Sequence, residues 1–164
     1  MKRSYAVVTG ASSGIGACFA RRLAQEGYAL VLVGRRERLT KLAQELEKNG
    51  TQVVIKTADL ACKEECFRLM SALGDKKISV FINNAGFGDC GRFTETSLDK
   101  DLDMIDVNVR AVHILTKLVL RKMKRQGGGY LLNVASSAGL IPAGPYMATY
   151  YATKAYVASM TRAA

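Results

Sequence analysis

Short apolar runs alternate with longer amphipathic segments along the chain, and this alternation constrains the fold more than any other feature of the sequence. Each run is too short for a typical helix, and most are rich in the β-branched and aromatic residues that favour strands. The pattern predicts strands over Tyr5–Thr9, Ala29–Val33, Gln52–Lys56, Ile78–Ile82 and Tyr130–Val134.

The segments between these runs carry apolar residues at helical spacing, and several end at a glycine, which is a favourable helix stop. Helices are predicted over 14–27, 37–49, 63–73, about 99–124 and from about 149 to the end; the fourth is either continuous or broken near Asn108. Strands of this kind joined by amphipathic helices indicate an α/β fold. We expect a doubly wound parallel sheet in a three-layer α/β/α arrangement, with ligands bound outside the carboxyl ends of the strands.

A glycine-rich turn joins the first predicted strand to the first predicted helix, where Thr9–Gly16 reads TGASSGIG. Glycines allow a tight turn and a close approach of the backbone to a pyrophosphate, and the helix start offers N–H groups and a positive dipole end. The spacing is G-x-x-x-G-x-G rather than G-x-G-x-x-G, and ordinary turns also contain glycine. The position of the turn between strand and helix nevertheless predicts phosphate binding.

The end of the second predicted strand indicates which dinucleotide binds. Arg35 and Arg36 stand there, and no acid occurs before Glu37. An acid at this place would bind the ribose hydroxyls of NAD, whereas a guanidinium binds a 2′-phosphate through charge-assisted hydrogen bonds. We therefore expect NADP(H) in preference to NAD(H). The alternative is that both arginines are solvated residues at the start of a helix.

Three motifs taken together carry a family resemblance: TGASSGIG, the NNAG of Asn83–Gly86, and Tyr150-x-x-x-Lys154. Their order along the whole chain resembles the short-chain dehydrogenase/reductase family in its single-domain form. The resemblance implies a Rossmann-type NAD(P)-binding domain over residues 1–164. It also implies an oxidoreductase that transfers hydride between NADP(H) and a carbonyl or secondary alcohol substrate.

The resemblance assigns cofactor contacts to four places in the chain. The glycine turn would hold the pyrophosphate, the end of the second strand would select the 2′-phosphate, the end of the third would contact adenine, and the NNAG segment would line the cofactor. With Arg36 and the catalytic pair added, the expected cofactor residues are Gly10, Ser12, Ser13, Gly14, Ile15, Gly16, Arg35, Arg36, Asp59, Leu60, Asn84, Ala85, Gly86, Tyr150 and Lys154.

The same resemblance implies a catalytic set of Asn108, Ser136, Tyr150 and Lys154. Ser136 matches the catalytic serine by its place after the fifth predicted strand. The neighbouring Ser137 has the commoner spacing to Tyr150, so the two serines are alternatives, and we favour Ser136.

Tyr150 and Lys154 lie four residues apart, so they project from one face of a helix. A free tyrosine has a pKa of about 10, and a nearby ammonium favours the phenolate. Tyr150 is expected to protonate the carbonyl oxygen while the nicotinamide delivers hydride, Ser136 to hydrogen-bond that oxygen, and Asn108 to position a water in a proton relay. Taken singly, such a Tyr/Lys pair is usually a packing residue and a solvated amine, and such a serine is usually a cap.

The basic residues exceed the acidic ones, 24 to 14, which gives a formal net charge of +10. This indicates either an anionic partner or cations scattered over solvated helix faces. No nucleic-acid motif accompanies the charge, so we expect no nucleic-acid partner. The densest group suits a helix C-terminus and comprises Lys117, Arg121, Lys122, Lys124 and Arg125.

Four cysteines without a C-x-x-C pair, together with a single histidine, predict no metal site. No stretch reaches transmembrane length, and the first apolar run is too short for a signal peptide, so a cytoplasmic protein without a membrane partner is expected.

The sequence stops inside the predicted helix that carries Tyr150 and Lys154, whereas the family continues through further strands. The domain is therefore expected to be incomplete at its C-terminus, to lack the last strands and to leave a sheet edge unpaired. The resemblance also implies a homodimer or homotetramer formed through the helices around 108–124 and 150–162. The alternatives to an enzyme are a catalytically inactive NADP-binding fragment or an interaction module.

Overall fold

The computed structural model describes residues 4–34 and 36–164; the side chains of Arg36 and Glu37 lie outside this description. The strands are β1 (Ser4–Thr9), β2 (Ala29–Gly34), β3 (Val53–Thr57), β4 (Lys77–Asn83) and β5 (Tyr130–Asn133). The α-helices are α1 (Gly14–Gln25), α2 (Arg36–Lys48), α3 (Lys63–Ala72), α4 (Leu98–Ile105), α5 (Val112–Gln126) and α6 (Ala148–Ala163).

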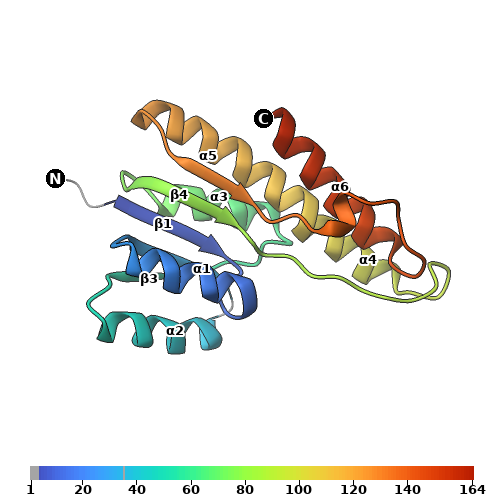
Figure 1. The fold of residues 1–164 in the computed structure, drawn as a ribbon, viewed down its shortest axis with the longest axis horizontal. Helices are drawn as coiled ribbons and strands as arrows, with labels where there is room; N and C mark the ends of the chain where they lie inside the picture. The colour runs from blue at the N-terminus through green and yellow to red at the C-terminus, as the bar shows by residue number, and fades with distance from the viewer. Residues whose placement is uncertain (1–3, 35) are drawn as a thin grey trace.

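The strands form one parallel sheet in the order β3-β2-β1-β4-β5 (Figure 1). The chain moves outward from β1 to β3, then crosses back to β4 on the other side of β1 and continues to β5. This confirms the predicted doubly wound sheet. The reversal of strand order between β1 and β4 marks the place at which sheets of this kind generally bind ligands.

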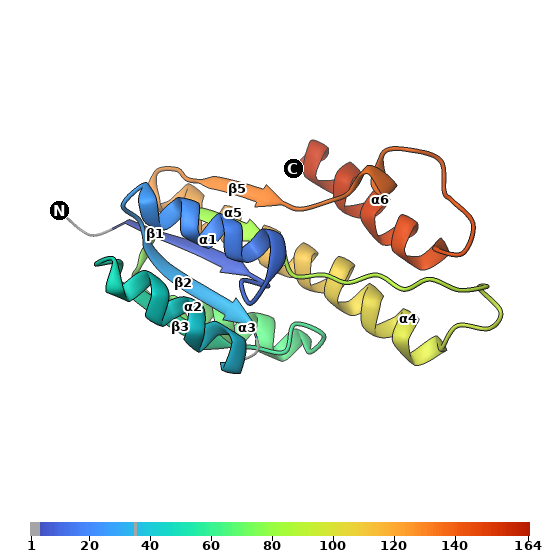
Figure 2. The same cartoon turned by 60° about the horizontal axis from the view of Figure 1, so that its bottom comes forward.

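Successive side chains along each strand enter two different cores, because strand side chains alternate between the faces of a sheet. On one face, Ala6 and Val8 of β1 pack with residues of α1 and α2. On the other, Val7 packs with residues of α3 and α5. Figure 2 shows α1 and α2 on their face of the sheet, so the three-layer arrangement is confirmed.

The predicted elements agree with the structure to within a few residues, except in the fourth helix. There α4 and α5 are joined without a break in the chain path by a π-helical turn, η1 (Asp106–Ala111), which contains Asn108. The helix is therefore neither one regular helix nor broken near Asn108, since it continues but changes its winding over η1. Gly127, with a φ of 89°, then closes α5 in the left-handed conformation.

β5 forms one edge of the sheet, and only one of its faces is covered. Leu131 packs into the core beneath α5, whereas Tyr130 and Leu132 are 76% and 42% exposed. An apolar edge strand of this kind is prone to pair with other chains. Among the described residues, no helix combines the length and the apolar character that crossing a bilayer requires.

Candidate active site

Buried polar side chains gather at the carboxyl ends of the central strands. Thr9, Asn83 and Asn133 occupy the last positions of β1, β4 and β5, and all three are at most 7% exposed. Burial of such groups is costly unless they are hydrogen-bonded, so their bonds define how the site is built.

Thr9 ties the end of β1 to the segment after β4. Its Oγ1 accepts hydrogen bonds from the backbone N–H groups of Asn84 (3.0 Å) and Ala85 (3.1 Å). The Asn84 side chain also bonds to the turn, since its Nδ2 donates to the carbonyl oxygens of Thr9 and Gly10, both at 3.1 Å. The NNAG segment is therefore held directly against the glycine turn.

The glycines of the turn are required by this close packing. Gly10 has a φ of 63°, and a Cβ there would lie 2.8 Å from the Cα of Ala85. A Cβ on Gly16 would overlap the carbonyl oxygen of Gly10. The start of α1 remains open to solvent, because Ser13, Gly14 and Ile15 are exposed. Free N–H groups at an exposed helix start of this kind can bind an anion.

The predicted adenine and 2′-phosphate contacts are only partly described. Asp59 is exposed after β3 and accepts a hydrogen bond from the backbone of Ala61, whereas Leu60 is 8% exposed and belongs to the core. Arg35 lies outside the described residues, and so does the side chain of Arg36.

Asn108 lies within the π-helical turn and bonds to two other segments, the one that follows β4 and α6. Its Oδ1 accepts from the N–H of Phe87 (3.1 Å), and its Nδ2 donates to the carbonyl oxygen of Phe87 (2.8 Å) and to Thr153 Oγ1 (3.1 Å). Thr153 in turn donates to the carbonyl oxygen of Tyr150 (2.8 Å). Both N–H groups of the amide are therefore used within the protein, and they position the segment after β4 against α6.

Lys154 is a nearly buried cation, 6% exposed. Its Nζ donates to the carbonyl oxygen of Val134 (2.9 Å) and lies 5.9 Å from the centroid of the Tyr150 ring. Burial lowers the pKa of Lys154 below its ordinary value. The expected Tyr/Lys pair is thus brought together on α6, at the sheet end that carries the glycine turn.

Glycines let the surrounding backbone approach this pair. A Cβ on Gly86 would lie 3.4 Å from Lys154 Nζ, and one on Gly88 would lie 2.9 Å from the Tyr150 ring. Gly139 is in backbone contact with Lys154, and a Cβ there would overlap that carbonyl group. The sequence motifs include Gly86 but gave no signal for Gly88 or Gly139.

The two candidate serines have different surroundings. Ser136 is half-buried, extended, and caps the short 3₁₀ turn η2 (Ser137–Gly139) by accepting from Ala138 N (3.2 Å). Ser137 is exposed within that turn. The capping bond uses Ser136 as an acceptor, so this bond leaves its hydroxyl proton free to be donated.

A buried network of side-chain hydrogen bonds holds α6 against the strand ends. Sequence analysis did not assign its residues to the site. Asn83 Nδ2 donates to Asn133 Oδ1 (2.8 Å), which also accepts from Thr116 on α5 (3.2 Å), and Asn133 Nδ2 donates to Thr161 on α6 (2.9 Å). These bonds connect β4, β5, α5 and α6. They place the helix that carries Tyr150 relative to the strand ends.

The arrangement has the components of a nucleotide-dependent acid–base site. The solvent-exposed glycine turn and the Tyr150/Lys154 pair share one end of the sheet, and the described residues contain no cluster of three or more His, Cys, Asp or Glu that would hold a metal ion.

Comparison with known proteins supports this description. The family model "short chain dehydrogenase" matches residues 4–164. An uncharacterised oxidoreductase of Staphylococcus epidermidis is 35% identical over 165 residues, which is 99% of this chain and 70% of the relative.

Two solved structures have nearly the same fold. A short-chain dehydrogenase from Sphingobium yanoikuyae in complex with NADPH has a TM-score of 0.91 at 34% identity, covering 98% of this chain and 63% of that one. A short chain dehydrogenase/reductase from Burkholderia phymatum in complex with NAD has a TM-score of 0.91 at 31% identity, covering 99% and 59%. The chain thus spans about three-fifths to seven-tenths of the length of these three proteins. The present chain belongs to the short-chain dehydrogenase family of oxidoreductases.

Proposed function

We propose that this protein is an NADP(H)-dependent oxidoreductase that interconverts a carbonyl compound and a secondary alcohol. The observation that carries the proposal is the placement of Lys154 Nζ beside the Tyr150 ring, at the sheet end where Thr9 and Asn84 hold the glycine turn. A nicotinamide cofactor, when bound, supplies the hydride that reduces the carbonyl carbon.

Tyr150 donates its hydroxyl proton to the carbonyl oxygen as that oxygen becomes an alcohol, and accepts the proton in the reverse reaction. The Lys154 ammonium stabilises the phenolate that remains, because an opposite charge nearby favours the ionised form. Ser136 donates a hydrogen bond to the same oxygen and stabilises the developing negative charge. Tyr150 thus transfers the proton, whereas Lys154 and Ser136 stabilise the negative charge that forms.

Asn108 acts in this proposal as a positioning residue. Both of its N–H groups are bound to Phe87 and Thr153, so a water in a proton relay would have only the second lone pair of Oδ1 to bind on this side chain. Its hydrogen bonds hold α6, and with it Tyr150, against the segment that follows β4.

The preference for NADP(H) rests on residues of this chain. Similar structures contain NADPH in one case and NAD in another, so the fold alone does not decide the coenzyme. Two arginines, Arg35 and Arg36, follow β2, and no acid lies between the end of this strand and Glu37. This arrangement favours the phosphorylated dinucleotide.

Replacing Tyr150 by Phe tests the assignment, because it removes one hydroxyl. We expect NADPH oxidation with a panel of aldehydes and ketones to fall at least about 100-fold, while NADPH affinity changes little. Tyr151→Phe is the matched control, since it removes the same group from the next residue of α6.

Undiminished turnover in Tyr150→Phe would show that another group transfers the proton. A wild-type protein that binds NADPH but reduces no member of the panel would instead support the non-catalytic alternative.

A further inference from the structure

Two loops project past the carboxyl ends of the strands, at the end of the molecule where Tyr150 lies (Figure 1). The first loop, residues 84–97, joins β4 to α4, and the second loop, residues 134–147, joins β5 to α6 and contains η2. The N–H of Gly91 in the first loop donates to the carbonyl oxygen of Tyr146 in the second (2.8 Å). A substrate whose carbonyl group reaches the Tyr150 hydroxyl would therefore have its remaining atoms beside these two loops.

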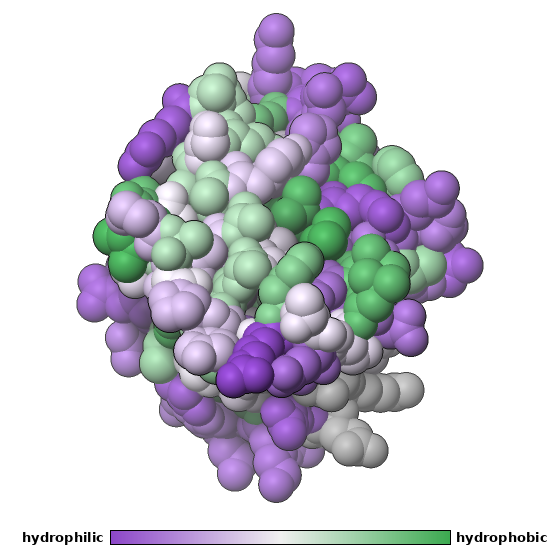
Figure 3. Space-filling view, turned by 90° about the vertical axis from the view of Figure 1, so that its right-hand side faces the viewer, coloured by the Kyte–Doolittle hydropathy of each residue, from purple (hydrophilic) through white to green (hydrophobic). Residues whose placement is uncertain are grey.

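Aromatic side chains of both loops are exposed next to Tyr150. Phe93 of the first loop and Tyr146 of the second line one small cavity together with Tyr150. At about 10 Å³ the cavity is too small for a substrate, so the three rings lie close together. Phe93 and Tyr146 nevertheless remain 68% and 55% exposed, and Figure 3 shows apolar side chains on this end of the molecule. Apolar surface is thus available to a ligand beside the phenol.

The backbone of Tyr146 adopts a conformation that its side chain disfavours. Its φ is 67°, and among the described residues no other residue except glycine has a positive φ. A bulky side chain is rare in this left-handed region, and such outliers cluster at ligand-binding sites. Glycine or asparagine would fit here without the same strain, so the presence of a tyrosine points to a role for its ring.

Neither loop offers an unpaired cation. Residues 126–153, which include β5 and the whole second loop, contain no Asp, Glu, Lys, Arg or His. In the first loop, Asp89 binds Lys100 (2.7 Å) and Arg92 binds Glu95 (3.4 Å). A carboxylate or phosphate group bound between the loops would lose hydration without gaining an opposite charge, which is costly.

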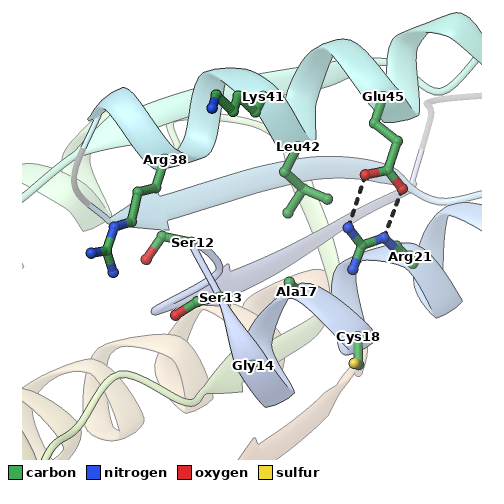
Figure 4. A pocket seen from close by; sticks show the side chains of 10 residues that line it. All are labelled: Ser12, Ser13, Gly14, Ala17, Cys18, Arg21, Arg38, Lys41, Leu42 and Glu45. Carbon is green, nitrogen blue, oxygen red and sulfur yellow. Dashed lines mark hydrogen bonds and ion pairs between the residues drawn. The ribbon is translucent and has the colours of Figure 1, made fainter.

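The other cations at this end of the sheet do not change this conclusion. Lys154 is nearly buried and donates to the carbonyl oxygen of Val134. Arg38 and Lys41 line a cleft of about 470 Å³ between α1 and α2 (Figure 4). Because α2 packs on β2 and β3 whereas α6 packs on β5, this cleft and Tyr150 lie on opposite sides of β1.

We propose that the exposed rings of Phe93 and Tyr146 bind the apolar substituent of an uncharged ketone, so that the protein discriminates against keto acids and phosphorylated substrates. The inference rests on the proposed function and names its substrate class. An apolar substituent is removed from water as it packs on the two rings, and an aromatic substituent gains ring contacts as well. An anionic substituent gains neither an apolar contact nor a salt bridge.

The test uses two ketones of similar size, 4-isopropylacetophenone and 4-acetylbenzoate, in which an isopropyl group and a carboxylate occupy the same ring position. With NADPH and the wild-type chain, kcat/KM is expected to be about 10- to 100-fold higher for the uncharged ketone. Saturation-transfer difference NMR in the presence of NADP⁺ measures ketone binding without turnover, and it should give tighter binding for 4-isopropylacetophenone.

Phe93→Lys places a cation beside Tyr150. It is expected to lower the preference for the uncharged ketone at least about tenfold, mainly by raising kcat/KM for 4-acetylbenzoate. Phe67→Lys is the matched control, because Phe67 is a half-exposed residue of α3 that belongs to neither loop.

Tyr146→Asn removes the ring and accepts the left-handed backbone. It is expected to lower kcat/KM for 4-isopropylacetophenone about 5- to 10-fold without lowering the melting temperature. A tyrosine with a purely structural role would give the opposite result, a lower melting temperature with the preference between the two ketones unchanged.

An equal or higher kcat/KM for 4-acetylbenzoate in the wild-type chain would overturn the inference and leave the oxidoreductase activity in place. The same holds if Phe93→Lys changes the preference no more than Phe67→Lys does, or if only other carbonyl compounds are reduced. A wild-type chain that oxidises NADPH with no carbonyl compound would overturn the inference together with the proposed function.

Discussion

Lys154 is the residue at which stability and proposed function conflict most directly. Its ammonium is almost buried and donates to a carbonyl oxygen, and no carboxylate pairs with it among the described residues. Burial lowers its pKa because the charged form loses hydration. The proposed role of this cation beside the Tyr150 phenol is thus obtained at a cost in folding free energy.

Lys154→Met should therefore raise the free energy of unfolding by about 1 kcal/mol while abolishing activity. Below the lowered pKa of the folded state the lysine is charged in both states, and the full gain is present. As the pH rises from there towards the ordinary value of 10.5, the folded chain releases the proton first and the gain shrinks. Urea unfolding of both proteins from pH 7 to 10 measures the difference, and a gain that grows with pH would contradict this account.

Sequence analysis missed several residues of the site for the same physical reason, which is that their bonding partners are distant in the sequence. Thr9 bonds to backbone groups about 75 residues away, Asn133 reaches Thr161 across β5 and α6, and Thr153 reaches Asn108. A side chain whose role depends on a distant partner leaves no local pattern. The glycine turn and the Tyr/Lys pair were predictable because their spacing within one segment already determines their geometry. The roles assigned to Asn108, Ser136, Tyr150 and Lys154 stay predictions.

At the scale of elements, the strands and most helices followed from periodicity because each buries a face with a regular repeat. The π-helical turn did not, since a shift of the apolar pattern by one residue does not distinguish a π turn from a break between two helices. The contact between η2 and α6 was equally hidden. It depends on Gly139 lying against the backbone of Lys154, which only the folded arrangement reveals.

Gly139→Ala should consequently push η2 away from α6, because its Cβ would lie 2.7 Å from the carbonyl carbon of Lys154. Since backbone atoms on both sides would have to move, we expect a loss of about 1–3 kcal/mol in the free energy of unfolding. Gly34→Ala is the control, as its Cβ would approach its nearest neighbour, the side chain of Leu39, no closer than 3.7 Å. Equal stability of the two variants in urea would show that η2 yields without strain.

At the scale of the whole molecule, the proposed coenzyme would join two halves. The glycine turn belongs to the half that begins with β1, and Tyr150 and Lys154 belong to the half that begins with β4. β1 and β4 pair directly, and Thr9 extends that pairing past the strand ends. A ligand lying across this joint would stabilise both halves together.

NADPH at about 100 times its dissociation constant should therefore raise the free energy of unfolding by about 2.7 kcal/mol and the melting temperature by roughly 5–10 °C. A single cooperative transition, followed by circular dichroism, would shift as a whole. Two separated transitions, of which only one responded to NADPH, would show that the halves unfold independently and that the coenzyme binds only one of them. Association as a homodimer or homotetramer and a cytoplasmic location stay predictions, the former open to sedimentation velocity.

The long helix from α4 to α5 runs beside the sheet and past its carboxyl end (Figure 1), and apolar side chains are exposed on the face of the molecule that Figure 3 shows. A π turn holds about one residue more than an α turn, and one residue corresponds to about 100° of helix rotation. Met104 before the turn and Leu115 after it are both buried in this phase. A chain one residue shorter here would still form a helix, but α4 would present a different side to α6. The number of residues in this stretch therefore determines the orientation of α4 as much as their identity does.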